Sequence, residues 1–282
     1  MLKHKLTRLA AVCMAVAGLF LNSCKSAPVE APVDPVELLD DNGAIYLTVP
    51  VQPNLDFVTK AIVKIAKCNS ADAEKISKRI NNLYIEIGTN GEAQISGDGD
   101  FPSKMLGLVL TEKNGWLKSP FQTYSYYTNK KSLHQLSIPS SSVACISRNA
   151  EKMLSRYDNI AKDDLHSVQM EGQIYEFLKS NNSKAIQVYA PVPGAFIKTF
   201  IGANVNTPVE SISGVFTKLP EGNEFGLKII LQMKDPRTVK AACAALKIAL
   251  FPVPAKIVQT GSTQITVTDI TLTYNELLAF LK

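Results

Sequence analysis

Two stretches of this chain carry the same order of secondary-structure signals, so the sequence predicts one folding unit used twice. Each stretch begins with an apolar strand that ends at prolines, residues 44–49 in the first and 185–189 in the second. An amphipathic helix, a hairpin, a helix beginning at an aspartate and a proline, a second hairpin, a short strand and a last helix follow in each stretch. The matched positions are 131 residues apart for Gly91 and Gly222, 134 for Pro102 and Pro236, 132 for Asn129 and Gly261, and 141 for Tyr46 and Gln187.

One insertion explains the larger first offset, because a helix predicted at residues 71–80 has no counterpart in the second stretch. The predicted fold class is α+β, an internally duplicated unit of antiparallel hairpins with amphipathic helices packed on the sheet. The predicted domains are a first repeat at 44–159, a helical connector at 160–184 and a second repeat at 185–282.

The strongest hairpin signal is Asn90-Gly91, between strands predicted at 83–87 and 93–96. This pair suits a type I′ turn, in which both central residues have positive φ angles. The other predicted strands are 121–128, 132–138, 211–217, 225–233, 255–259 and 264–268. Helices are predicted at 55–67, 150–157, 172–178, 195–203 and 275–281, and after Pro102 and Pro236.

Residues 1–23 have the features of an export signal. Three basic residues precede an apolar stretch at 9–20 that is too short to span a bilayer, and small or polar residues follow. With cysteine at the junction, the run Leu21-Asn22-Ser23-Cys24 resembles the lipobox of bacterial lipoproteins, in which the cysteine is acylated and begins the mature protein. Asn22 departs from the strictest form, and loose lipoboxes of this kind are typical of spirochaetes. An ordinary secretory signal with a chance cysteine is the alternative.

Residues 24–43 are predicted as the acylated cysteine followed by a proline-rich, extended tether. Three of the 30 Lys and Arg residues and none of the 25 Asp and Glu residues precede Cys24, so removal of the signal lowers the net charge from +5 to +2. No cluster of basic and aromatic residues stands out, so a nucleic-acid partner is not expected. No later apolar run reaches about 18 residues, so the expected anchor is lipid rather than a transmembrane helix.

The sequence gives little support for catalysis. Cys68, Cys145 and Cys243 form no CxxC motif and are expected to be small buried apolar side chains, although one disulfide among them stays open in an exported protein. After the signal, His134 and His166 are the remaining histidines, and neither an H-E-x-x-H nor a G-x-S-x-G motif occurs. We therefore expect no enzyme activity, no metal and no cofactor.

The amphipathic helices carry the functional prediction. The helix predicted at 55–67 has an apolar face and a basic face, and the segment at 195–203 is apolar over more than one face. A broad apolar helix is either buried or meets an apolar partner such as a lipid. The residues predicted for membrane or lipid contact are Leu55, Val58, Ile62, Ile65, Phe196, Ile197, Phe200 and Ile201, and those predicted for headgroup contact are Lys60, Lys64 and Lys67.

The loose lipobox, the proline-containing tether and an α+β body with several apolar amphipathic helices resemble the outer-membrane-associated lipoproteins of treponemes. The resemblance implies helices that switch between closed and open arrangements, associate with the inner leaflet of the outer membrane and alter bilayer permeability. It also implies a lipid-anchored protein in the cell envelope, on the periplasmic leaflet of the outer membrane.

Two functions from different classes therefore stay open. The first is a lipid-anchored protein that inserts amphipathic helices into the bilayer, with membrane lipids as its partner. The alternative is a lipoprotein that binds a lipid or another hydrophobic ligand in a cavity between helices and sheet. Exposed apolar helix faces would favour insertion, and an enclosed apolar pocket would favour the ligand. A surface adhesin and an envelope hydrolase are weaker alternatives, and the sequence does not predict an oligomeric state.

Overall fold

The computed structural model describes residues 33–66, 68–102, 107, 110–162, 170, 172–180, 184–201, 208–220, 222–251 and 253–279. Residues 33–282 form one compact unit. Cys24 and Lys67 lie outside the described residues, as does most of the helix predicted after Pro102.

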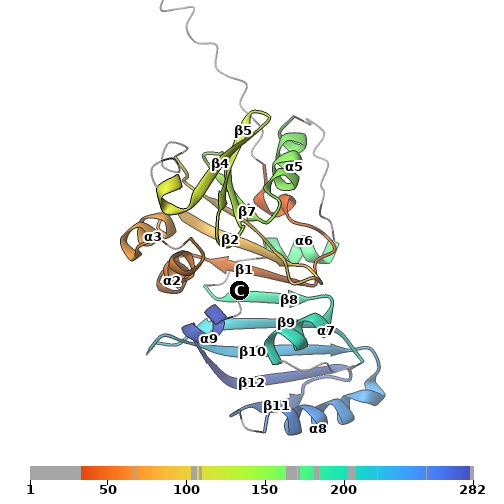
Figure 1. Ribbon diagram of the computed structural model, residues 1–282. Helices are drawn as coiled ribbons and strands as arrows, with labels where there is room; N and C mark the ends of the chain where they lie inside the picture. Colours follow the sequence, from red (N-terminus) through yellow and green to blue (C-terminus); the bar gives the residue numbers. More distant parts are fainter. Residues whose placement is uncertain are drawn as a thin grey trace, which may run out of the picture. The chain divides into compact units, whose positions relative to one another are not determined.

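Within the described residues, twelve strands form one antiparallel sheet in the order β11-β12-β10-β9-β8-β1-β2-β3-β7-β6-β5-β4 (Figure 1). The α+β fold predicted from the hairpin signals is therefore confirmed. The strands are β1 (Ile45–Pro50), β2 (Ile80–Ile87), β3 (Ala93–Gly99), β4 (Trp116–Phe121), β5 (Tyr124–Asn129), β6 (Gln135–Ser140), β7 (Val143–Ser147), β8 (Ile186–Ala190), β9 (Val209–Lys218), β10 (Glu224–Met233), β11 (Lys256–Gln259) and β12 (Gln264–Thr273).

The two halves of the sheet join where β1 pairs with β8. The pairing is antiparallel and matches Tyr46 with Tyr189, Leu47 with Val188 and Thr48 with Gln187. From this junction the strand order runs outward through β2 and β3 on one side and through β9 and β10 on the other. The internal duplication itself stays a prediction.

Helices cover both faces of the first half of the sheet and one face of the second half. The helices are α2 (Leu55–Ala66), α3 (Ser70–Ser77), α5 (Ala150–Lys162), α6 (Gly172–Lys179), α7 (Pro193–Ile201), α8 (Val239–Ala249) and α9 (Tyr274–Ala279), with short 3-10 turns η1 (Pro35–Leu38), η2 (Gln52–Asn54), η3 (Glu112–Asn114) and η4 (Pro236–Thr238). Residues of α2, α3, α7, α8 and α9 share one apolar core, and residues of η1, α5 and α6 share another.

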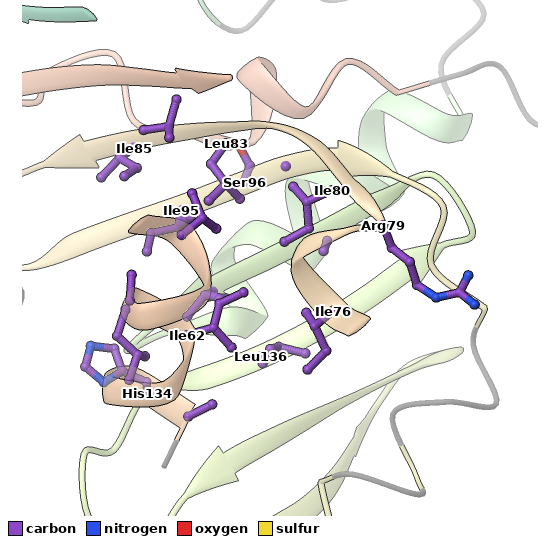
Figure 2. Close-up of a pocket in the computed structure, with 18 of the residues that line it drawn as sticks. Ile62, Ile76, Arg79, Ile80, Leu83, Ile85, Ile95, Ser96, His134 and Leu136 are labelled. Carbon is purple, nitrogen blue, oxygen red and sulfur yellow. The ribbon is translucent and has the colours of Figure 1, made fainter. Parts of the chain in front are cut away.

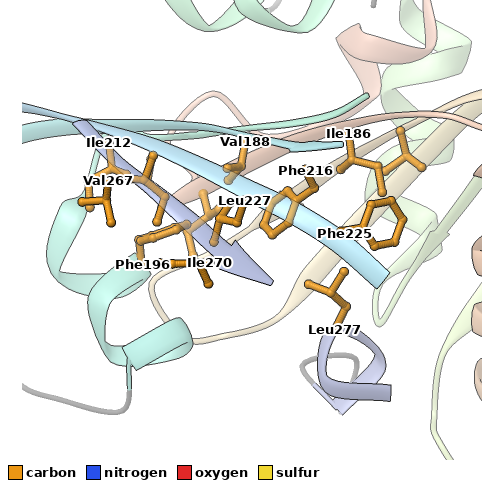
Figure 3. Close-up of a cluster of buried hydrophobic side chains, with 14 of the residues drawn as sticks. Ile186, Val188, Phe196, Ile212, Phe216, Phe225, Leu227, Val267, Ile270 and Leu277 are labelled. Carbon is orange, nitrogen blue, oxygen red and sulfur yellow. The ribbon is translucent and has the colours of Figure 1, made fainter. Parts of the chain in front are cut away.

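Strand alternation explains how one sheet serves two cores. Along β1, Ile45 and Val49 join the first core and Tyr46 joins the second, because successive side chains of a strand point to opposite faces. In the second half, Phe216, Phe225 and Leu227 of β9 and β10 pack under α7 and α9 (Figure 3).

The Asn90-Gly91 turn differs from the prediction. Gly91 has a positive φ angle of 80°, but Asn90 does not have one, so the turn is not type I′. The amide of Gly91 donates to the carbonyl of Gly88 at 2.9 Å, and the amide of Gly88 donates to the carbonyl of Glu92 at 2.9 Å. This pattern is a tight turn followed by a left-handed glycine, the usual form of a three-residue hairpin loop.

The end of the predicted tether is folded, so the boundary predicted at residue 43 is wrong. Asp34 caps η1, its side chain accepting a hydrogen bond from the amide of Val36 at 3.1 Å. Val36, Leu38 and Leu39 are buried in the core that α5 and α6 share. The packed part of the chain begins by Val33, and the apolar side chains of this stretch pack against Tyr46 and Tyr157. Pro35 begins the short helical turn η1.

Two strand predictions also differ. The strand predicted at 121–128 is split by a turn at Gln122, whose φ angle is 51°, and the hairpin partner β4 was missed. Pro120 lies inside β4, and proline within a strand is tolerated here because β4 is at the edge of the sheet. In the second half of the sheet, the sequence predicts a separate short strand after residue 268. In the structure these residues continue β12 past Asp269 to Thr273.

Asn54 links the start of α2 to the second half of the chain. Its buried amide donates to the carbonyls of Pro50 at 2.8 Å and of Lys184 at 3.1 Å. We expect Asn54→Ala to lower the free energy of unfolding by about 1–2 kcal/mol, since the buried carbonyl of Pro50 and the carbonyl of the exposed residue Lys184 lose their donor. Urea unfolding checks this, with Asn223→Ala at an exposed turn as the matched control. Equal stability of the two variants would contradict the prediction.

Candidate functional site

A pocket of about 420 Å³ lies between α2, α3 and the sheet (Figure 2). Apolar side chains of β1, β2, β3, β6 and β7 form its floor, and α2 and α3 cover it. The lining includes Leu47, Leu83, Ile85, Ile95, Leu136, Ile138 and Ile146 from the sheet and Ile62, Ile65 and Ile76 from the helices. Its volume lies within the range of about 300–1,000 Å³ found for small-molecule sites, and its lining is more uniformly apolar than most.

The apolar face predicted on α2 points into this pocket. Val58, Ile62 and Ile65 recur at helical spacing and line the pocket, while Leu55 packs against the neighbouring core. Val58 is buried, and the other three side chains are half-buried. The sequence therefore identified the apolar face of α2, and the structure places most of it over a cavity.

The residues predicted on α7 lie elsewhere. Phe196 and Ile197 are buried in the first core and do not line the pocket (Figure 3). The side chains of Phe200 and Ile201 lie outside the described residues. The two predicted contact regions are therefore not brought together into one site, and membrane contact by α7 stays a prediction.

The basic face of α2 contacts α9. The Lys60 ammonium lies 5.0 Å from the centre of the Tyr274 ring, and the Lys64 ammonium donates a hydrogen bond to the carbonyl of Leu278. A cation at the last carbonyls of a helix is favourable because these groups have no partner within the helix. Headgroup contact by Lys60 and Lys64 stays a prediction.

Three aromatic rings hold the first turn of α2 in place. Phe57 meets the rings of Phe225 and Tyr274 edge to face, at centroid distances of 5.3 and 5.4 Å. Phe225 and Tyr274 are themselves 5.1 Å apart. In the following turn, the Thr59 hydroxyl donates to the Ser77 hydroxyl at 3.0 Å, which joins α2 to α3. The cover of the pocket is therefore fixed at one end of α2.

One polar side-chain atom that faces the pocket is buried without a hydrogen-bond partner among the described residues, Nδ1 of His134. Ser96 also borders the pocket, but it pairs with Tyr84 and Cys145, so its buried hydroxyl faces the core that α5 and α6 share. Burial lowers the pKa of His134, and Arg148 lowers it further, so the imidazole is neutral at pH 7. A buried polar atom without a partner costs about 1–3 kcal/mol, so Nδ1 of His134 is a candidate for contact with a bound molecule.

The three described cysteines are free. Cys68 lines the pocket, Cys145 is buried, and burial raises the pKa of the Cys145 thiol to about 12. In the part of the chain that the structure describes, no three His, Cys, Asp or Glu side chains gather as metal ligands, and no helix has the length and apolar character needed to cross a membrane.

Comparisons with known proteins agree with this architecture. A family described as outer membrane-associated lipoprotein TP0453 matches residues 30–278. Crystal form I of TP0453, a treponemal protein, is 21% identical with a TM-score of 0.68, and the match covers 89% of this chain and 97% of that one. Crystal form III is 20% identical with a TM-score of 0.67 and coverages of 89% and 98%, and crystal form IV is 20% identical with a TM-score of 0.63 and coverages of 91% and 99%. No curated protein sequence matches the chain.

Proposed function

The chain belongs to the TP0453 family of outer membrane-associated lipoproteins, and we propose that it binds a lipid or another long apolar molecule in the pocket under α2 and α3. The observation that carries the proposal is the pocket of about 420 Å³ with its apolar lining. The proposed role is non-catalytic. The protein holds its ligand close to the membrane from which the ligand comes, and an acylated Cys24 would keep it there.

The lining defines the chemical class of the ligand. Leu83, Ile95 and Leu136 offer hydrocarbon contacts from three strands, and Ile62 offers them from α2 (Figure 2). Each methylene group moved from water into such surroundings contributes about 0.8 kcal/mol, so an acyl chain of ordinary length supplies ample affinity. Arg79 also lines the pocket, but its guanidinium points away from the apolar side chains (Figure 2) and pairs with Asp100 at 3.0 Å. A charged headgroup would therefore stay outside the apolar floor.

One polar atom adds specificity to this binding. The neutral His134 ring can accept a hydrogen bond from a ligand hydroxyl through Nδ1. A ligand with a hydroxyl group on a hydrocarbon chain would satisfy this atom, and a purely hydrocarbon ligand would leave it without a partner.

Native mass spectrometry of the body lacking residues 1–24, purified without detergent from a bacterial envelope, tests the proposal. We expect a bound apolar molecule, and we expect Leu83→Trp, which fills the pocket, to lower its occupancy about tenfold, equivalent to 1.4 kcal/mol. The matched control is Ile230→Trp, which adds the same ring to a half-buried position on another strand, outside this pocket. Equal occupancy in the two variants would remove the pocket as the site.

Insertion of α2 into the bilayer is the second candidate. It is favoured by the two-sided character of α2, whose apolar side covers an open cavity instead of packing tightly on the sheet. Insertion needs α2 to leave the pocket, so a bound ligand and the membrane would compete for the same face. We expect the body lacking residues 1–24 to float with anionic liposomes, and loading with a fatty acid to reduce flotation. Failure to float would end this candidate without affecting the first.

A further inference from the structure

A single cation borders the pocket, and it lies at one end of it. Arg79, between α3 and β2, is the only lysine or arginine among the described residues that line the pocket. Figure 2 shows its side chain beyond Ile76 and Ile80, with the guanidinium group directed away from the apolar side chains. An apolar stem along a cavity and a charged head in water is the usual arrangement of arginine at such a border. The pocket therefore has an apolar interior and one positively charged end.

The backbone at this end of the pocket is closely held. The amide of Asp100 donates to the carbonyl of Arg79 at 2.8 Å. A Cβ atom on Gly99 would lie 2.1 Å from the same carbonyl oxygen, so only glycine fits there. The side-chain amide of Gln52 donates to the carbonyls on both sides of Arg79, at 3.3 Å each. The guanidinium group therefore starts from a fixed point beside the cavity, and only the side chain has freedom to move.

The partner of Arg79 is easily replaced. Its Nη1 lies 3.0 Å from the Asp100 carboxylate, whose side chain is 82% exposed. An ion pair that open to water contributes little to stability. A guanidinium group has a planar fork of donors that matches the two oxygens of a carboxylate. A ligand whose apolar chain already occupies the pocket can therefore place its own carboxylate where that of Asp100 now binds.

The length of the pocket sets the length of the chain. Strands β3 and β6 both pair with β7, in a register that places His134 level with Ala93 at the start of β3. Arg79 lies beside Gly99 at the end of the same strand. Residues 93 to 99 span six steps along the strand, or about 20 Å at about 3.3 Å per residue. The hydrocarbon of one bilayer leaflet is about 15 Å thick, so this floor accommodates one extended acyl chain of a membrane lipid.

We propose that the ligand of the pocket is a long-chain carboxylic acid, bound with its carboxylate on Arg79 and its chain along the floor towards His134. This inference rests on the proposed function and adds the chemical class of the ligand and its direction in the pocket. One cation matches one negative charge, which favours a fatty acid over a lipid with a dianionic phosphate. The carboxylate stays at the water-exposed end, so no charge enters the apolar interior.

The fluorescence of Trp116 tests the proposal. Trp116 is the single tryptophan of the chain, is buried and lines the pocket, so a brominated chain in the pocket quenches it. The protein is the body lacking residues 1–24, which includes the whole compact unit of residues 33–282, freed of bound lipid. The probes are dibromooctadecanoic acid and its methyl ester, which have the same chain and differ in charge. We expect both to quench Trp116, and we expect the Kd of the acid to be about tenfold lower than that of the ester.

Three variants assign the preference to Arg79. Arg79→Gln should raise the Kd of the acid about tenfold and leave that of the ester unchanged. Asp100→Asn, which removes the competing carboxylate, should lower the Kd of the acid about threefold. The matched control is Arg237→Gln, at an exposed arginine that also pairs with an aspartate, Asp235 at 2.6 Å, and lies outside the lining. It should leave both constants unchanged.

Two results would overturn the proposed ligand class and leave the pocket as a lipid site. They are equal affinity of the parent for the two probes, and an equal loss of affinity for both probes in Arg79→Gln. Absence of quenching by either probe would instead remove the pocket as a lipid site, and the proposed function and this inference would fall together.

Discussion

Phe225→Ala is expected to lower the free energy of unfolding by about 3–5 kcal/mol, the usual cost of removing a fully buried aromatic ring. Phe225 is 0% exposed and contacts the rings of Phe57 and Tyr274. These three rings come from β10, α2 and α9, so the change leaves a cavity where two helices meet the sheet. Urea unfolding, monitored by far-UV circular dichroism, measures the loss.

Because Phe57 also lines the pocket, the same variant should loosen the cover of the pocket. We expect Cys68, which lies in the lining, to react faster with a thiol reagent in Phe225→Ala than in the parent. Phe251→Ala is the matched control, since its ring is exposed and its loss should change stability by less than about 0.5 kcal/mol. A loss as small in Phe225→Ala as in the control would show that the three rings do not hold α2.

The free energy of unfolding is also expected to decrease as the pH rises, because of the buried Glu86 carboxyl. The Glu86 carboxyl is 3% exposed, and burial together with the nearby Asp40 raises its pKa to about 7, against the opposing influence of Lys152 and Arg156. The folded protein therefore holds a proton that the unfolded chain releases near pH 4.5. Stability is greatest below this value and falls as the pH rises through 7. At about 1.4 kcal/mol per pK unit, we expect a fall of about 2–3 kcal/mol between pH 5 and 8.

Glu86→Gln should remove most of this fall, because the amide has no proton to lose. Comparison with the parent is needed because the lowered pKa of His134 acts in the opposite direction, adding stability as the pH rises towards 6.5. Asp40 does not interfere, since its pKa is lowered and its contribution is lost only in stronger acid. Glu210→Gln, at an exposed position on β9, is the control. The same pH slope in Glu86→Gln and the parent would assign the effect to other groups.

Local patterns in the sequence predicted most of the regular structure. The alternation in β9 and β10 and the helical spacing in α2 place their apolar residues on one face, and tertiary packing uses those faces as expected. Asp235 and Pro236 begin the short turn η4, which leads into α8 at Val239, and the Asp235 side chain accepts from the amide of Arg237 at 2.9 Å. These signals come from residues that are close together in the chain, so a single sequence is enough to predict the helices and strands.

The pocket depends on residues that are distant in the sequence and was not predicted as a particular site. The face of α2 was visible, but the floor beneath it comes from Leu83, Ile95 and Leu136 on three strands. The exposure of Ile248 and Phe251 was missed for a related reason: the stripe of α8 that packs on the core was recognised, and the exposed apolar residues outside it were not.

The central position of β1 has a consequence for how the chain is made. A protein synthesised and exported from its N-terminus completes β1 and β2 long before β8, whose first residue is Ile186. Until then one edge of β1, with Tyr46 to Thr48, has no strand beside it. The apolar side chains of β1 also lack the part of their core that the second half of the chain contributes. Such an edge is the usual starting point for wrong pairing between chains. The interval between the completion of β1 and of β8 is therefore the period in which this edge is most open to wrong pairing with another chain.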